Sequence, residues 1–138
     1  MLMRKKFFCA LVFLTSCSPG SIREYQIEGE DVARNITKIL ERVNSPQDLE
    51  RESLKLKKEY ALLVKVIIDA KKYQNNHPEE EVRGVFSSEV SDSLKKEFMR
   101  IYQIEGCQDV MEALQRESLH KLDVYHRKWE GMRTEISH

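Results

Sequence analysis

Glycine, proline and cysteine are all scarce in this chain of 138 residues, which contains 5 Gly, 3 Pro and 3 Cys. A chain with so few turn-forming residues is not expected to be a β-sandwich, a β-barrel or a low-complexity linker. Charged residues make up 33% of the sequence, which excludes a protein with several membrane spans. The length suits one domain and is too short for two.

An excess of either charge is also lacking, since 23 basic residues face 23 acidic ones. The first 16 residues, however, contain Arg4, Lys5 and Lys6 and no acid. Without them, 20 basic residues remain against the same 23 acidic ones, a net charge of −3. A mildly acidic chain is not expected to bind nucleic acid, nor to be attracted electrostatically to an anionic lipid surface.

A basic stretch followed by an apolar run opens the chain. Residues 1–6 carry the three positive charges, residues 7–14 are all apolar, and Thr15-Ser16-Cys17 follows. This order is typical of a secretory signal, because the charges stay in the cytoplasm while the apolar run enters the translocon. The run is shorter than the roughly 20 apolar residues of a membrane-spanning helix. The sequence therefore predicts export.

The four residues Leu14-Thr15-Ser16-Cys17 resemble the lipobox of bacterial lipoproteins, which is a branched aliphatic residue, a small residue, Gly, Ala or Ser, and then Cys. The resemblance implies that Cys17 receives a diacylglycerol on its sulfur and that residues 1–16 are cleaved as a signal peptide. Some hosts then also acylate the new amine. An ordinary signal peptide with a Cys there by chance is the alternative.

Ser18 follows the expected lipidation site. In lipoproteins of bacteria with two membranes, Asp at this position usually retains the protein in the inner membrane, whereas Ser permits export to the outer membrane. The resemblance thus implies a lipid anchor at Cys17 on the exported side of a bacterial membrane, with the outer membrane favoured if the host is Gram-negative.

Cysteine usage agrees with that expectation. Cys9 would leave with the signal and Cys17 would carry lipid, so Cys107 alone would remain as a thiol. No intramolecular disulfide is then possible, although an exported compartment would permit one. We expect Cys107 to be a small buried or helix-end residue, and an intermolecular bridge is the alternative.

Helical periodicity dominates the rest of the chain. Apolar residues recur at steps of 3 and 4 over four segments, with breakers at 45–46, 75–78 and near 106. The expected helices cover about 31–44, 46–74, 79–101 (with an interruption near Gly84 and Ser87) and 109–136. Within the second, Leu63 and Ile67 are expected to be buried, and a buried strand over 61–68 is the runner-up. The sequence predicts an all-α fold, a small antiparallel bundle of four to five helices.

The expected domain organisation follows from these two parts. Residues 1–16 are the signal peptide, residues 17–27 are the lipidated Cys and a tether, and residues 28–138 are the helical bundle domain. Two short sequences recur along the chain: 23–29 resembles 100–106, and 51–54 is identical to 116–119. Either two helical hairpins have diverged, or the recurrence is chance in a helix-rich composition.

Motifs for catalysis are hard to find. The sequence has no Gly-rich phosphate loop and no G-x-S-x-G elbow. Glu117-x-x-His120 and Asp123-x-x-His126 have the form of the metal-binding step of ferritin-like bundles. Both lie on one expected helix, however, and steps of three drift around it, so that Glu117 and His126 reach opposite faces. We therefore expect that the protein has no metal site, binds no cofactor and is not an enzyme.

Tyr125, Trp129 and Met132 form an apolar stripe near the end of the chain. The stripe suits core packing against the second helix, or a surface for a protein partner, since such residues are enriched in interfaces. The expected function is that of a membrane-anchored lipoprotein of the bacterial envelope with a non-catalytic structural or protein-binding role. The alternatives are a regulatory or inhibitor lipoprotein that captures one exported partner, and a metal-dependent enzyme that uses His120 and His126.

Overall fold

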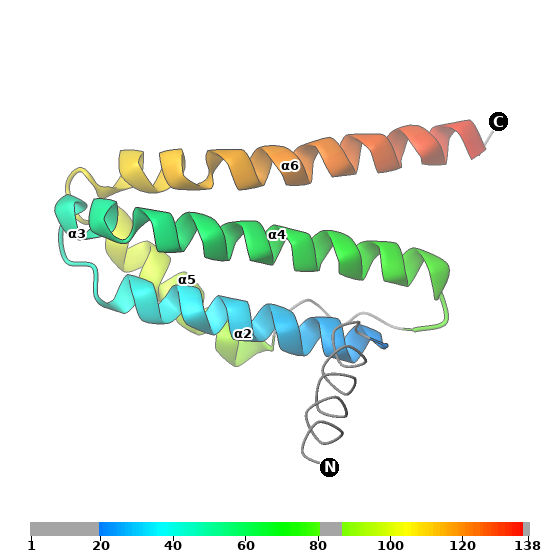
Figure 1. Ribbon diagram of the computed structural model, residues 1–138, viewed down its shortest axis with the longest axis horizontal. Helices are drawn as coiled ribbons and strands as arrows, with labels where there is room; N and C mark the ends of the chain where they lie inside the picture. Colours follow the sequence, from blue (N-terminus) through cyan, green and yellow to red (C-terminus); the bar gives the residue numbers. More distant parts are fainter. Residues whose placement is uncertain (1–19, 81–86, 137–138) are drawn as a thin grey trace, which may run out of the picture.

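The computed structural model describes residues 20–80 and 87–136, with side chains as far as residue 132 (Figure 1). The described residues form helices and no strands. The helices are α2 (Ile22–Glu41), α3 (Pro46–Arg51), α4 (Ser53–Asn76), α5 (Ser88–Tyr102) and α6 (Cys107–Ile136). The predicted all-α bundle is confirmed, and the strand alternative for 61–68 is wrong because those residues lie inside α4. Residues 1–16, the expected signal peptide, and Cys17 lie outside the described residues.

The four long helices run alternately in opposite directions, as in an up-down-up-down bundle. α4 lies between α2 and α6, and α5 crosses behind α2 in the view of Figure 1. Tyr25 near the start of α2 contacts Tyr73 near the end of α4, so these two helices are antiparallel. α6 runs in the same direction as α4, because α5 carries the chain back to the end where α4 begins.

The first of the described helices, α2, begins at Ile22, well before the expected start near 31 and before the expected domain boundary at 28. Ser21 caps the helix, since its hydroxyl oxygen accepts a hydrogen bond of 3.3 Å from the backbone N–H of Glu24. The tether predicted over 17–27 is therefore too long, because residues 22–27 are the first turns of α2.

The next helix start is as predicted. The Ser45 hydroxyl accepts a 3.1 Å hydrogen bond from the Asp48 N–H, and Pro46 occupies the first helical turn. This helix ends after a turn and a half, at Arg51, and Glu52 separates α3 from α4. The single helix expected over 46–74 is therefore two helices, α3 and α4.

The start of α5 differs from the prediction. Glu79 and Glu80 lie in a turn after α4, not in a first helical turn, and α5 begins at Ser88 with Ser87 as its cap. The expected helix residues Val82, Gly84 and Phe86 lie outside the described residues.

A tight turn joins α5 to α6 and uses Gly106 in the left-handed region, with φ of 84°. That conformation is easy only for glycine. A β-carbon there would also lie 3.1 Å from Cγ of Pro46, which shows how closely the turn packs on α3. α6 then begins at Cys107, slightly earlier than the expected 109.

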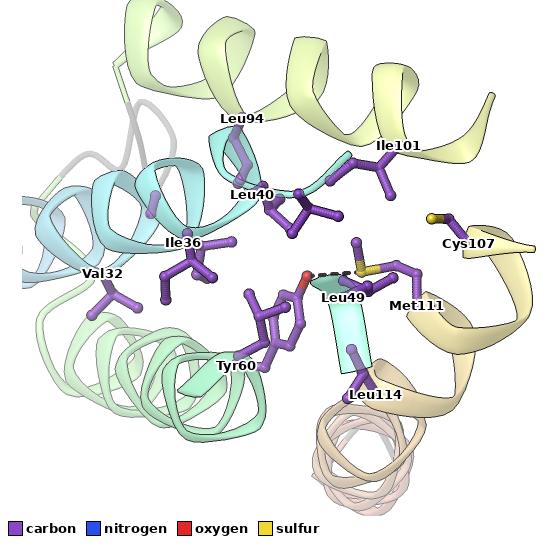
Figure 2. Packing of buried hydrophobic residues seen from close by; sticks show 14 of the residues in the cluster. Val32, Ile36, Leu40, Leu49, Tyr60, Leu94, Ile101, Cys107, Met111 and Leu114 are labelled. Carbon is purple, nitrogen blue, oxygen red and sulfur yellow. Dashed lines mark hydrogen bonds between the residues drawn. The ribbon is translucent and has the colours of Figure 1, made fainter. Parts of the chain in front are cut away.

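The hydrophobic core lies where α3, α5 and α6 meet the adjoining halves of α2 and α4 (Figure 2). Its largest fully buried side chains are Ile36, Leu40, Leu49, Leu56, Ile101, Met111, Val43 and Cys107. The thiol of Cys107 is free, and burial raises its pKa. The structure thus places this residue both in the core and at a helix end, as expected.

The hydroxyl group of Tyr60 lies inside this core and forms hydrogen bonds there. The Tyr60 hydroxyl donates to the Met111 sulfur at 3.3 Å and accepts from the Gln115 side-chain amide at 3.3 Å (Figure 2). Burial raises the pKa of Tyr60 to about 12, so this phenol stays protonated at every physiological pH.

The prediction that Leu63 and Ile67 are buried is wrong, since both are half-buried. α4 packs against helices on two sides, and its buried positions divide between them. Ala70 is buried one turn before Tyr73, which contacts α2, whereas Val64 is buried two turns before Lys71, which contacts α6. Leu63 and Ile67 lie between these two stripes, at the margin of the core.

Candidate functional site

The candidate residues gather at one end of the bundle, which we call the entry end. It comprises the start of α2, the last turn of α4 with residues 77–80, and the last turns of α6. Figure 1 shows that α2 begins, and that α4 and α6 end, on the same side of the molecule. Cys17, the expected lipidation site, lies outside the described residues but close to this end in sequence.

Residues 20–24 fix the chain as it enters the fold. The Glu24 carboxylate accepts a hydrogen bond from the backbone N–H of Gly20, while the Glu24 N–H donates to the Ser21 hydroxyl. This reciprocal pair is a variant of the capping box, in which Glu24 accepts from the N–H of Gly20 and not from that of the cap residue Ser21. It satisfies donors at the helix start and orders the chain immediately before Ile22.

Glu80 joins the start of α2 to the end of α4. One of its carboxylate oxygens accepts from the Ile22 N–H at 3.1 Å, and the other accepts from the Tyr73 hydroxyl at 2.8 Å. The Tyr73 oxygen also lies 3.1 Å from the Gly20 carbonyl oxygen. The Ile22 N–H, followed by the Tyr73 hydroxyl, holds the pKa of Glu80 below its usual value. We call Gly20, Ile22, Tyr73 and Glu80 the entry clamp.

Aromatic rings extend the entry clamp. The rings of Tyr25 and Tyr73 have centroids 5.5 Å apart, and the His77 ring stacks on Tyr73 at 4.1 Å. The Nδ1 atom of His77 also lies 3.0 Å from the Tyr73 carbonyl oxygen. Such contacts bring aromatic side chains, each with a polar edge, together where the chain enters the bundle.

The stripe of Tyr125, Trp129 and Met132 lies on α6 over the end of α4. Tyr125 and Trp129 are half-buried, and Met132 is 56% exposed. The Lys72 ammonium lies 5.9 Å from the centre of the Tyr125 ring. Trp129 lines an open cleft of about 420 Å³ with Gln74, Asn75 and Pro78. The stripe therefore packs partly on α4 and leaves part of its apolar surface in solvent.

The two histidine motifs do not converge. Glu117 and His120 are exposed, while His126 is half-buried and accepts a hydrogen bond from the Lys71 ammonium. Within residues 20–80 and 87–136, no group of three or more His, Cys, Asp or Glu side chains is arranged to hold a metal ion.

The entry clamp is a feature that the sequence reasoning missed. It depends on contacts between residues more than fifty positions apart, which no local pattern reveals. The Ser21-x-x-Glu24 spacing was the available local signal, since it is the sequence form of a capping box. It would have placed the helix start at residue 22.

None of the described helices combines the length and the apolar character needed to cross a membrane. Comparisons with protein-family models, curated proteins and solved structures find no match to this chain.

Proposed function

We propose that this chain is the precursor of a lipoprotein of the bacterial envelope. Residues 1–16 are its signal peptide, Cys17 carries the lipid, and the helical bundle has a non-catalytic structural or protein-binding role on the exported side of the membrane. The observation that carries the proposal is Leu14-Thr15-Ser16-Cys17 directly after a basic stretch and an apolar run. Ser18 favours the outer membrane if the host has two membranes.

The start of the fold supports this division of the chain. α2 begins at Ile22, so cleavage before Cys17 leaves each of the described helices whole. The one cysteine that would remain unmodified, Cys107, is buried in the core, where it is shielded from thiol exchange in an oxidising compartment.

The test compares two cysteine substitutions in a bacterial expression host supplied with radiolabelled palmitate. Wild type should incorporate the label, resist a high-salt wash of the membranes and be released by detergent, because acyl chains anchor through the hydrophobic effect. Cys17→Ala should carry no label and should be soluble or remain uncleaved. Cys9→Ala changes a cysteine within the signal peptide and serves as the matched control, which should behave as wild type.

Two results would contradict the proposal. One is a Cys17→Ala chain that still carries palmitate, which would place the acyl group elsewhere. The other is a wild-type chain that is unlabelled or leaves the membrane in high salt, which would identify an ordinary secreted protein.

A further inference from the structure

Resting on the proposed lipid at Cys17, we infer that the entry end of the bundle docks on the lipid surface, with Trp129 and Met132 of α6 seated in the headgroup layer. The proposed function requires an anchor and leaves the orientation of the domain open. Three features limit the possible orientations of the bundle on the membrane. They are the short distance between Cys17 and Gly20, the hydrogen bonds that hold Gly20, and the side chains at the entry end.

The tether is short. Three Cα–Cα steps separate Cys17 from Gly20, and each spans about 3.8 Å, so these residues are at most about 11 Å apart. That reach is similar to the thickness of the polar headgroup region, which takes up about 5–8 Å on each side of a bilayer. An acylated Cys17 would thus hold the start of α2 beside the membrane.

The tether ends on a fixed point of the fold. The Gly20 N–H donates to Glu24, and its carbonyl oxygen lies 3.1 Å from the Tyr73 hydroxyl of α4. Because α2 and α4 are both joined to this residue, a restraint on Gly20 is a restraint on the whole entry end. The helix start at Ile22 is also held to the turn after α4, because its N–H donates to the Glu80 carboxylate at 3.1 Å.

α6 reaches furthest at this end. Lys71 of α4 contacts His126 of α6, which is 55 positions later in the sequence. Because the two helices run in the same direction, the same offset places Asn76, the last residue of α4, level with Gly131. α6 continues to Ile136, which at 1.5 Å per residue carries it about 7 Å beyond α4. Figure 1 shows α6 extending past the end of α4. The turn that bears Met132 is therefore among the first parts of the bundle to meet a surface at this end.

The side chains there suit a membrane interface. Trp and Tyr concentrate at headgroup level because their rings are apolar while one edge forms hydrogen bonds. Trp129, Tyr25 and Tyr73 lie at the entry end, and Met132 is 56% exposed. Arg23, Glu24, Lys128 and Glu130 contribute charges of both signs. The docking is therefore aromatic and apolar, and it does not need an anionic surface.

Trp129 is the single tryptophan of the sequence and reports on the contact directly. Purified, acylated wild type is placed in vesicles of zwitterionic phospholipid, with or without a lipid that carries a nitroxide quencher near its headgroup. We expect the quencher to lower the emission about twofold or more, because interfacial side chains lie within about 5–10 Å of the headgroup boundary. A nitroxide deep in the acyl region should quench less.

The matched control moves the tryptophan to the other end of the molecule. The variant W129F/L54W places the reporter at Leu54, which is 80% exposed and lies about 30 Å along α4 from Gln74. Its emission should not change with either quencher. A soluble chain with Cys17→Ala, mixed with the same vesicles, should also be unquenched.

The outcomes separate this inference from the proposed function. If acylated wild type floats with the vesicles and shallow and deep quenchers both leave Trp129 unaffected, the docking is overturned and the lipoprotein stands. If mass analysis finds no acyl group on the chain, both are overturned. If the Leu54→Trp reporter is quenched as strongly as Trp129, the bundle lies along the surface and end-on docking is wrong.

Discussion

At the scale of single residues, a few polar side chains hold the helix ends together. Arg100 of α5 donates to the backbone carbonyls of Leu40 at 2.7 Å and Val43 at 2.8 Å, and its Nε donates to Glu97 at 2.8 Å. The Leu40 carbonyl also accepts from the Val43 N–H at 3.0 Å, so Arg100 supplies a second donor there and a side-chain donor for the Val43 carbonyl just beyond the end of α2. Glu80 serves the start of the same helix. Both ends of α2 thus depend on side chains from distant parts of the chain.

The role of Glu80 predicts a pH-dependent stability. Its pKa is lowered from 4.5 in the folded protein, mainly by the Ile22 N–H and then by the Tyr73 hydroxyl. A lowered carboxyl pKa stabilises the fold at pH values above 4.5, and this contribution is lost as the pH falls through the lower, folded-state pKa. Wild type should therefore unfold at a higher urea concentration than Glu80→Gln at neutral pH, and the difference should shrink in acid.

The neighbouring acid provides the control for that experiment. Glu79 is exposed and lies in the same turn. Glu79→Gln should not reproduce the pH-dependent difference. A gap between wild type and Glu80→Gln that stays constant from neutral to acidic pH would mean that the carboxylate charge has no part in the clamp.

At the scale of elements, local pattern predicts which segments are helical but not where each one starts. The 3–4 periodicity correctly places α4 and α6, because long amphipathic segments carry many concordant residues. The predicted start of α5 is wrong because the three acidic residues after Pro78 resemble the first turn of a helix. Glu80 instead binds the N–H of Ile22, and a contact across 58 positions has no local signature.

The recurring short sequences make the same point. Residues 23–29 lie inside α2, whereas their counterpart at 100–106 spans the end of α5 and the following turn. Gly29 is buried within a helix, and Gly106 adopts a left-handed conformation. Residues 51–54 likewise span the junction of α3 and α4, while 116–119 lie within α6. Tertiary context decides the structure of these segments, and the copies are not structural repeats.

The packing of α4 predicts that two leucines, two positions apart in the sequence, contribute very differently to the free energy of unfolding. Leu56 is fully buried, and Leu54 is 80% exposed on the same helix. Leu56→Ala should lower the free energy of unfolding by about 2–5 kcal/mol, since it removes contacts and leaves a cavity. Leu54→Ala should change it by less than about 0.5 kcal/mol. Similar losses at both positions in urea unfolding would contradict the assigned orientation of α4.

At the scale of the whole molecule, the two ends of the bundle differ in composition. The fully buried core lies away from the entry end, around Leu40, Leu56 and Met111. The entry end holds half-buried aromatic rings and the polar clamp. The periodicity of the sequence predicts the helices that build the core but places Leu63 and Ile67 too deep in it, and the order of charge, apolar run and Cys17 predicts the anchor. The entry clamp depends on contacts between residues more than fifty positions apart, so it forms only when the chain folds.

The most direct measurement of the central claim is mass spectrometry of the N-terminal peptide of the mature protein purified from bacterial membranes. The account predicts a chain that has lost residues 1–16 and begins at Cys17, with a mass increased by a diacylglyceryl group and, where the host adds one, a third acyl chain. An unmodified N-terminus at another residue, or an intact residue 1, would contradict it.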